Sequence, residues 1–130
     1  MKLVLKCGGY KISALDVERE IMTLDYVSEC MVVGVEDTEF GQRVAAALVL
    51  KETSAFLSLC ELRKDLRHRL AGYKMPTIMR IVEGELPKTA TGKVSKKMLG
   101  PRLFPPDYRS CREVQFWDSG MCYNAPESRL

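Results

Sequence analysis

The chain is poor in the residue types that build metal centres. Its 130 residues include a single histidine, His68, and five cysteines that are scattered without a Cys-x-x-Cys pair. Zinc sites need several such ligands at short spacing, so the sequence predicts no metal site. Scattered cysteines are also typical of a reducing compartment, and we expect all five thiols to be free.

Long apolar runs and a strong net charge are missing as well. The apolar runs at 31–35 and 44–50 are far too short to span a bilayer, so we expect no membrane span. The net charge is only +3, from 20 basic and 17 acidic residues, and no aromatic residues are interleaved with the lysines. The sequence therefore disfavours nucleic acid as a partner.

The composition is that of one globular domain with a different final segment. Hydrophobic residues make up 46% of the chain and charged residues 28%, which is ordinary for a soluble domain. From Pro101 onward the chain contains four of its six prolines and several isolated aromatic residues. We therefore expect a domain over 1–100 and an extended, loosely docked tail over 101–130.

Short apolar runs predict the strands of this domain. Residues 3–5 and 10–12 flank a Cys-Gly-Gly turn, which predicts an N-terminal β-hairpin. Three further runs, at 30–35, 44–50 and 77–82, are also expected to be strands, and the second is almost wholly apolar. The sequence thus predicts an α+β fold with a small three-stranded antiparallel sheet, in which 44–50 is central and helices flank the strands.

Serine residues predict where the helices begin. Ser58 and Glu61 have the spacing of a capping box, leucines follow at helical spacing, and Gly72 is expected to end that helix. Ser13 is expected to begin an earlier helix. Its expected apolar face consists of Leu15, Val17, Ile21, Met22 and Leu24. A last short helix is expected over 95–99, ended by Gly100 and Pro101.

The most informative segment is the threonine-rich loop at 86–95. Its basic residues and their neighbours on the following helix are Lys88, Lys93, Lys96 and Lys97, with no acid among them. Lysine is a compact cation on a flexible stem, so an anion is the natural partner of such a group. A plain solvated basic loop fits the same pattern. A Walker A phosphate loop does not, because Pro87 stands where that loop needs glycine and Val94 where it needs serine or threonine.

A second segment, at 6–18, reads Lys-Cys-Gly-Gly-Tyr-Lys-Ile-Ser-Ala-Leu-Asp-Val-Glu. Together with Leu-Pro-Lys-Thr-Ala-Thr-Gly-Lys at 86–93, it closely resembles the C-terminal domain of the acyl-adenylating superfamily. This superfamily contains acyl-CoA synthetases, the adenylation domains of peptide synthetases, and luciferases. The resemblance covers about residues 4–100, and the first segment is most similar to the malonyl-CoA synthetase branch.

The resemblance implies a catalytic role for Lys93. It matches the family lysine that reaches the substrate carboxylate and the α-phosphate of ATP during adenylation, with Thr91 and Gly92 supporting its loop. A carboxylate that attacks a phosphate brings two anions together, and a positioned cation offsets their repulsion as charge builds up in the transition state.

The resemblance also implies a CoA-binding role for the first segment. Gly8, Gly9 and Tyr10 match the loop that turns into the active site for thioester formation and lines the pantetheine channel. Lys6 and Lys11 are candidates for binding the CoA phosphates. A plain hairpin turn with solvated lysines is the alternative interpretation of these five residues.

Four other residues have structural interpretations. Glu18 is expected to face solvent or to pair with a base on its own helix. His68 lies between two arginines and is expected to be a surface residue. Phe116 and Trp117 are expected to be apolar contacts that dock the tail.

By resemblance, the chain is the mobile C-terminal domain of an acid–CoA ligase, which forms acyl-CoA, AMP and pyrophosphate from an acid, ATP and CoA with magnesium. The expected partner is a large N-terminal domain that these 130 residues do not contain. We therefore expect this chain alone to bind no cofactor and to catalyse nothing. The alternative is a non-catalytic regulatory or binding module that docks on a partner synthetase.

The final tripeptide predicts a compartment. Ser128-Arg129-Leu130 is similar to the Ser-Lys-Leu address that a peroxisomal import receptor reads at an exposed C-terminus. Coincidence in an arbitrary tail is the alternative. The predicted location is therefore peroxisomal or cytoplasmic.

Overall fold

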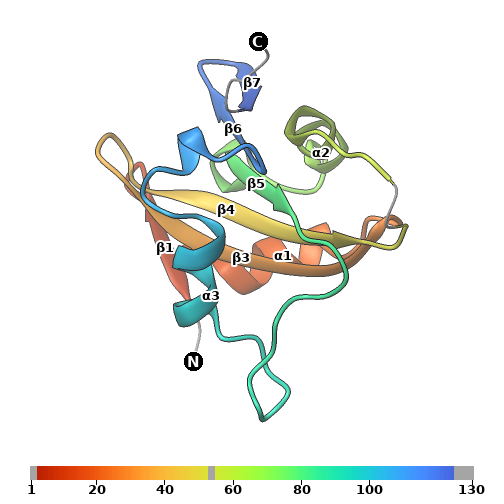
Figure 1. Cartoon of the computed structure of the whole chain (residues 1–130). Helices are drawn as coiled ribbons and strands as arrows, with labels where there is room; N and C mark the ends of the chain where they lie inside the picture. The colour runs from red at the N-terminus through yellow and green to blue at the C-terminus, as the bar shows by residue number, and fades with distance from the viewer. Residues whose placement is uncertain (1–2, 53–54, 125–130) are drawn as a thin grey trace.

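The computed structural model describes residues 3–52 and 55–124 (Figure 1). Within them the chain forms three α-helices and one mixed seven-stranded sheet. This confirms the predicted α+β class, although the sheet is larger than expected and contains one parallel pair. No helix in these residues is long and apolar enough to cross a membrane.

The N-terminal hairpin forms as predicted. β1 (Val4–Cys7) and β2 (Tyr10–Ser13) pair antiparallel around a turn made by Gly8 and Gly9. The φ angles of these glycines are +56° and +88°. Such left-handed values are what a two-residue turn between twisted strands requires, and glycine adopts them without a steric cost.

β4 is the central strand, as predicted. β3 (Val27–Asp37) and β4 (Gly41–Leu50) pair antiparallel, and β4 also pairs with β1 and with β5 (Ile78–Ile81). The pairing of β4 with β5 is parallel, which corrects the expected antiparallel sheet. Parallel neighbours need a long crossover connection, and the segment containing α2 provides it.

Both faces of β4 are buried, because successive side chains of a strand point to opposite faces. Val44, Ala46 and Leu48 join the core under α1 and α2. Ala45 and Ala47 join a second core, which α3 and the C-terminal strands cover. The two helical layers therefore share one central strand.

The first helix, α1 (Ala14–Ile21), begins at Ser13 as predicted, and the Ser13 hydroxyl accepts a hydrogen bond from the Asp16 N–H. Its predicted apolar face is partly wrong. The buried side chains that α1 contributes are those of Ala14, Val17 and Ile21, at the i, i+3, i+7 spacing of one helix face. Leu15 and Met22 are both 45% exposed, because they fall outside that face.

The second helix, α2 (Leu59–Leu66), has the predicted capping box between Ser58 and Glu61. Its predicted end at Gly72 is wrong. The helix ends at Leu66, whose carbonyl accepts hydrogen bonds from the N–H groups of Arg69 and Leu70. Gly72 instead begins the short helix η1 (Gly72–Lys74). This turn uses no left-handed residue, so it does not need glycine.

The C-terminal segment is not the extended tail that its prolines predicted. α3 (Lys96–Leu103) continues through Gly100 and Pro101 instead of ending there. It is followed by the short helix η2 (Tyr108–Ser110) and by two strands, β6 (Val114–Asp118) and β7 (Met121–Asn124). β6 pairs with β5, and its alternating side chains place Val114 and Phe116 in the second core. The predicted signal at 128–130 lies outside the described residues.

A disulfide joins the C-terminal strands to α2. Cys60 and Cys122 are 62 positions apart in the sequence and are bonded, whereas Cys7, Cys30 and Cys111 are free thiols. This corrects the expectation that all five cysteines are free. The pairing follows from the folding of β7 against α2, which no local spacing reveals.

We expect the loss of this disulfide to lower the free energy of unfolding by about 2–4 kcal/mol, because the bond closes a long loop in the unfolded chain. A Cys60→Ser/Cys122→Ser double variant should therefore unfold at a lower urea concentration. Cys111→Ser, which removes a free thiol, is the matched control. Equal unfolding midpoints for the double variant, the control and the parent chain would contradict the prediction.

Candidate functional site

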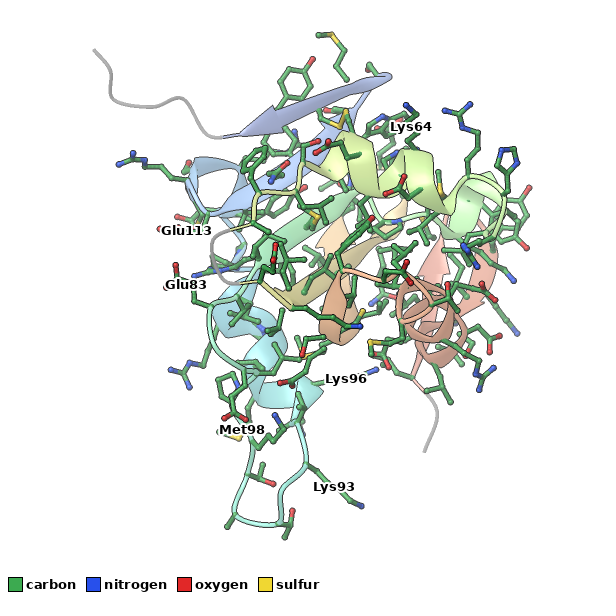
Figure 2. The ribbon with its side chains drawn as sticks, turned by 90° about the vertical axis from the view of Figure 1, so that its right-hand side faces the viewer. Lys64, Glu83, Lys93, Lys96, Met98 and Glu113 are labelled. Atoms are coloured by element: carbon green, nitrogen blue, oxygen red, sulfur yellow. A yellow bond between two sulfur atoms is a disulfide. The ribbon has the colours of Figure 1, made fainter. Side chains whose placement is uncertain are left out.

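Lys93 lies on a loop that projects from one end of the domain (Figure 2). The Thr89 N–H donates to the Lys93 carbonyl over 2.8 Å, and the Gly92 N–H donates to the Thr89 carbonyl over 2.9 Å. Gly92 has a φ of +84°, which closes this turn. The hydroxyls of Thr89 and Thr91 are 2.9 Å apart and form a hydrogen bond. Thr91 and Gly92 thus belong to the same hydrogen-bonded turn as Lys93.

The four lysines in and beside the loop fall into two groups. The Lys93 side chain is exposed and forms no ion pair with the described part of the chain, and the same holds for Lys97. Lys88 instead pairs with Glu29 and Glu85, and Lys96 pairs with Glu18. The expected group of four lysines facing an anion is therefore wrong for Lys88 and Lys96.

The environment of Glu18 also differs from the prediction. Its carboxylate pairs with Lys96 of α3 and accepts the Val32 N–H over 2.8 Å, and the side chain is only 14% exposed. It neither faces solvent nor pairs within its own helix.

The hydrogen bond from Lys88 to Glu29 raises the pKa of the Lys88 ammonium, so Lys88 stays charged at neutral pH.

Gly8 and Tyr10 lie away from the Lys93 loop, in the wall of a groove of about 660 Å³ that no residue of that loop lines. The residues that line it come from the N-terminal hairpin, the β3–β4 turn, η1 and β6. The rings of Tyr10 and Tyr73 stack with their centroids 4.0 Å apart. Phe40 and Trp117 add aromatic surface, so the groove is lined by aromatic residues from four segments.

Two arginines of the groove have different environments. Arg43 is 4% exposed, and its guanidinium contacts the carboxylates of Asp37 and Asp118 at 3.2 and 3.3 Å, so its charge is compensated. Arg63 lies over the Trp117 ring at 4.0 Å and donates to a backbone carbonyl over 2.7 Å. Burial lowers the pKa of Arg63, but a guanidinium stays charged at neutral pH.

A smaller hollow of about 210 Å³ adjoins this groove along α2. Its basic residues are Arg63, Lys64 and Arg67. Cys7 lines the groove itself, and burial raises the pKa of its thiol, so it offers no thiolate nucleophile. The groove therefore has aromatic walls and a basic border along α2.

The other predicted CoA residues lie on the hairpin but outside the groove. Lys6 and Lys11 are exposed cross-strand partners, and neither lines the cavity. Gly9 does not line it either, and a side chain added there would meet no atom within 4 Å. The structure thus brings Gly8 and Tyr10 into the groove and leaves the other three beside it.

Sequence reasoning missed several residues of the groove. Phe40, Tyr73 and Arg63 were given no role, because they come from segments that meet only in the folded domain. Trp117 packs against the first core, as expected of a docking contact, and it also lines the groove. Phe116 is buried in the second core, as expected. His68 is exposed, as predicted.

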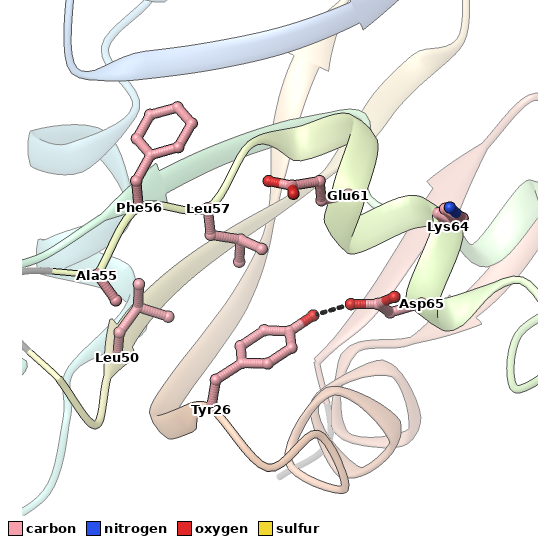
Figure 3. A pocket seen from close by; sticks show the side chains of 8 residues that line it. All are labelled: Tyr26, Leu50, Ala55, Phe56, Leu57, Glu61, Lys64 and Asp65. Carbon is pink, nitrogen blue, oxygen red and sulfur yellow. Dashed lines mark hydrogen bonds between the residues drawn. The ribbon is translucent and has the colours of Figure 1, made fainter.

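A third hollow, of about 350 Å³, contains no predicted site residue (Figure 3). The Tyr26 hydroxyl in its wall donates to the Asp65 carboxylate over 2.5 Å (Figure 3). Burial and this hydrogen bond raise the pKa of Tyr26, so the phenol stays neutral.

The described residues contain no group of three or more histidine, cysteine or acidic side chains placed to hold a metal ion, so no residue is assigned to magnesium.

The sequence matches a known family of domains. A family model described as the AMP-binding enzyme C-terminal domain matches residues 16–93. A CoA ligase of Gibberella moniliformis is 46% identical over 102 residues, which cover 78% of this chain and 17% of that protein. The mitochondrial malonate–CoA ligase ACSF3 of Mus musculus is 40% identical over 107 residues, which cover 82% of this chain and 18% of the relative.

Solved structures of CoA synthetases contain the same fold. o-Succinylbenzoate CoA synthetase (MenE) from Bacillus subtilis, bound to a product analogue, has a TM-score of 0.68 at 30% identity, over 77% of this chain and 20% of that chain. Apo MatB from Rhodopseudomonas palustris has a TM-score of 0.65 at 29% identity, over 74% and 19% of the two chains. The chain thus spans about a fifth of the length of the proteins it matches.

Proposed function

Because this chain belongs to the family of C-terminal domains of AMP-binding enzymes, we propose that it serves an enzyme that joins a carboxylic acid to CoA with consumption of ATP. The observation that carries the proposal is Lys93, an exposed lysine without an ion pair among the described residues, on a closed turn that projects from the domain. Such a cation can enter an active site formed mainly by another domain. There it would offset the repulsion between the attacking carboxylate and the α-phosphate of ATP.

We propose that the groove around Gly8 and Tyr10 binds part of the CoA molecule during thioester formation, the second half-reaction. Its volume lies within the range of small-molecule sites, about 300–1,000 Å³. The stacked rings of Tyr10 and Tyr73 offer apolar faces to an adenine ring. Arg63 and its neighbours on α2 offer donors to phosphate groups. Lys6 and Lys11, which lie beside the groove, remain proposed phosphate contacts.

The test is to join this domain to the large domain of a malonate–CoA ligase relative. We expect the 130-residue chain alone to show no ATP–pyrophosphate exchange, because it contributes only the smaller part of the expected site. The joined protein should form acyl-CoA from the relative's acid, ATP and CoA, well above the activity of the large domain by itself. A folded joined protein with no such gain would favour the alternative, a non-catalytic module that docks on a partner synthetase.

For a chain that ends at Leu130, we further propose a peroxisomal destination. The support is Ser128-Arg129-Leu130, the variant of a receptor-read address. A fluorescent reporter fused to the N-terminus of the 130-residue chain should be found in peroxisomes, and removal of Leu130 should make the signal diffuse. A diffuse cytoplasmic signal from the intact fusion would contradict the proposal.

A further inference from the structure

Two ion pairs hold the two stems of the Lys93 loop, one to β3 directly and one to a carboxylate of α1 that also contacts β3. Lys88 lies five positions before Lys93 and pairs with Glu29 of β3. Lys96 lies three positions after Lys93 and pairs with Glu18, which accepts the Val32 N–H of β3. In the described residues β3 pairs only with β4, so its outer edge is open to these contacts.

The first stem is held by several contacts of one ammonium group. The Lys88 Nζ donates to Glu29 over 3.0 Å, to Glu85 over 3.3 Å, and to the Leu86 carbonyl over 3.0 Å. Leu86 itself is 2% exposed and packs in the second core. The chain is therefore fixed immediately before the loop leaves the domain.

The second stem is held where α3 begins. Ser95, the first cap residue of α3, makes no capping hydrogen bond with its side chain. The pair of Lys96 with Glu18 therefore ties the start of this helix to α1 and, through the Val32 N–H, to β3. The side chains of this pair are 31% and 14% exposed, so the contact is partly shielded from water.

Partly exposed ion pairs contribute little to the free energy of unfolding. Their effect on geometry can be much larger. The turn between Thr89 and Lys93 is closed by its own hydrogen bonds, so the orientation of the stems sets the orientation of Lys93. A displacement of a catalytic group by about 1 Å can slow a reaction about a hundredfold.

We propose that Lys88 with Glu29, and Lys96 with Glu18, are positioning residues that aim Lys93 at the reacting acid and ATP. This inference rests on the proposed role of Lys93. It assigns two of the basic residues near the loop to orientation and leaves Lys93 as the group that contacts the substrates. The competing explanation is that Lys88 binds an anionic substrate directly.

A charge exchange separates the two explanations. In the joined enzyme, Lys88→Glu and Glu29→Lys should each lower the kcat of adenylation about tenfold, less than a full displacement because the other ion pair remains. The KM for ATP should change little. The double variant, which restores the pair with reversed charges, should recover most of the rate. Conversion of supplied acyl-adenylate and CoA should be unchanged throughout.

Lys97→Glu is the matched control, because Lys97 is exposed and carries no ion pair in the described residues. The substitution changes the net charge by the same amount as Lys88→Glu. A loss as large as that of Lys88→Glu would overturn the inference, and so would a double variant without recovery or a raised KM for ATP. Lys93→Ala distinguishes the failures. If it leaves adenylation intact, the proposed function is wrong. If it stops adenylation but the charge exchange does not recover the rate, only the positioning role is wrong.

The 130-residue chain provides a second readout that needs no activity. Lys88→Glu should speed hydrogen exchange at the Thr89 and Gly92 amides about tenfold, and the added Glu29→Lys change should restore their protection. The amides of β4 should exchange as in the parent chain. Faster exchange throughout β4 would indicate a general loss of stability and overturn the inference, as would unchanged exchange in the loop.

Discussion

In the joined enzyme, Lys93→Ala should slow adenylation about 10²–10³-fold, which corresponds to about 2.7–4 kcal/mol of transition-state stabilisation. The reason is electrostatic. The carboxylate and the α-phosphate repel one another most strongly as they meet, and the ammonium offsets that repulsion at this stage. Once the acyl-adenylate exists, the repulsion is gone. Conversion of supplied acyl-adenylate and CoA should therefore remain largely intact.

The structure separates an effect of this substitution on catalysis from an effect on stability. The Lys93 side chain is exposed and has no ion pair within the described residues, so its removal breaks no contact that stabilises the domain. We expect the free energy of unfolding to change by less than about 0.5 kcal/mol. Lys97→Ala, at a second exposed lysine without such a pair, should leave both half-reactions unchanged. Equal slowing of both half-reactions by Lys93→Ala would show that Lys93 acts in folding or domain docking.

Gly9→Trp should have the opposite selectivity, and slow thioester formation about a hundredfold while sparing adenylation. Gly9 lies in the hairpin turn beside the groove, and a side chain there points into open space in this domain. The turn is proposed to approach the active site for CoA, where a bulky side chain would displace the reacting groups. The measurement is acyl-CoA formation from supplied acyl-adenylate, alongside ATP–pyrophosphate exchange.

Backbone strain must be separated from this effect. Gly9 has a φ of +88°, so any other residue there costs about 1–2 kcal/mol of stability. Gly84→Trp is the matched control, because Gly84 has a φ of +81°, equally open surroundings, and no place in the groove. If Gly84→Trp slowed thioester formation as much as Gly9→Trp, strain alone would explain the result and the role of the hairpin turn would be wrong.

The features that the sequence by itself determined are local ones. The hairpin at Gly8 and Gly9 follows from the need for left-handed φ angles in a two-residue turn. The starts of α1 and α2 follow from serine side chains that satisfy N–H groups a few residues away. The apolar pattern at 44–50 made β4 the central strand. In each case the physical cause lies within a few residues of its effect, so a single sequence displays it.

The features that only the tertiary structure decided depend on residues far apart in the chain. The prolines after residue 100 predicted a tail, but Val114 and Phe116 bury apolar area against β5, and this burial outweighs local proline signals. The disulfide between Cys60 and Cys122 forms because β7 folds back beside α2.

The candidate site divides in the same way. Lys93 was identified from its loop, but its freedom from ion pairs among the described residues was not, because Glu29 and Glu18 reach the neighbouring lysines only in the folded domain. The groove could not be predicted either, since Tyr10, Tyr73 and Trp117 come from three segments that the sheet brings together. The sequence specifies the chemistry of each side chain. Packing between distant segments decides which charges form ion pairs and which surfaces face one another.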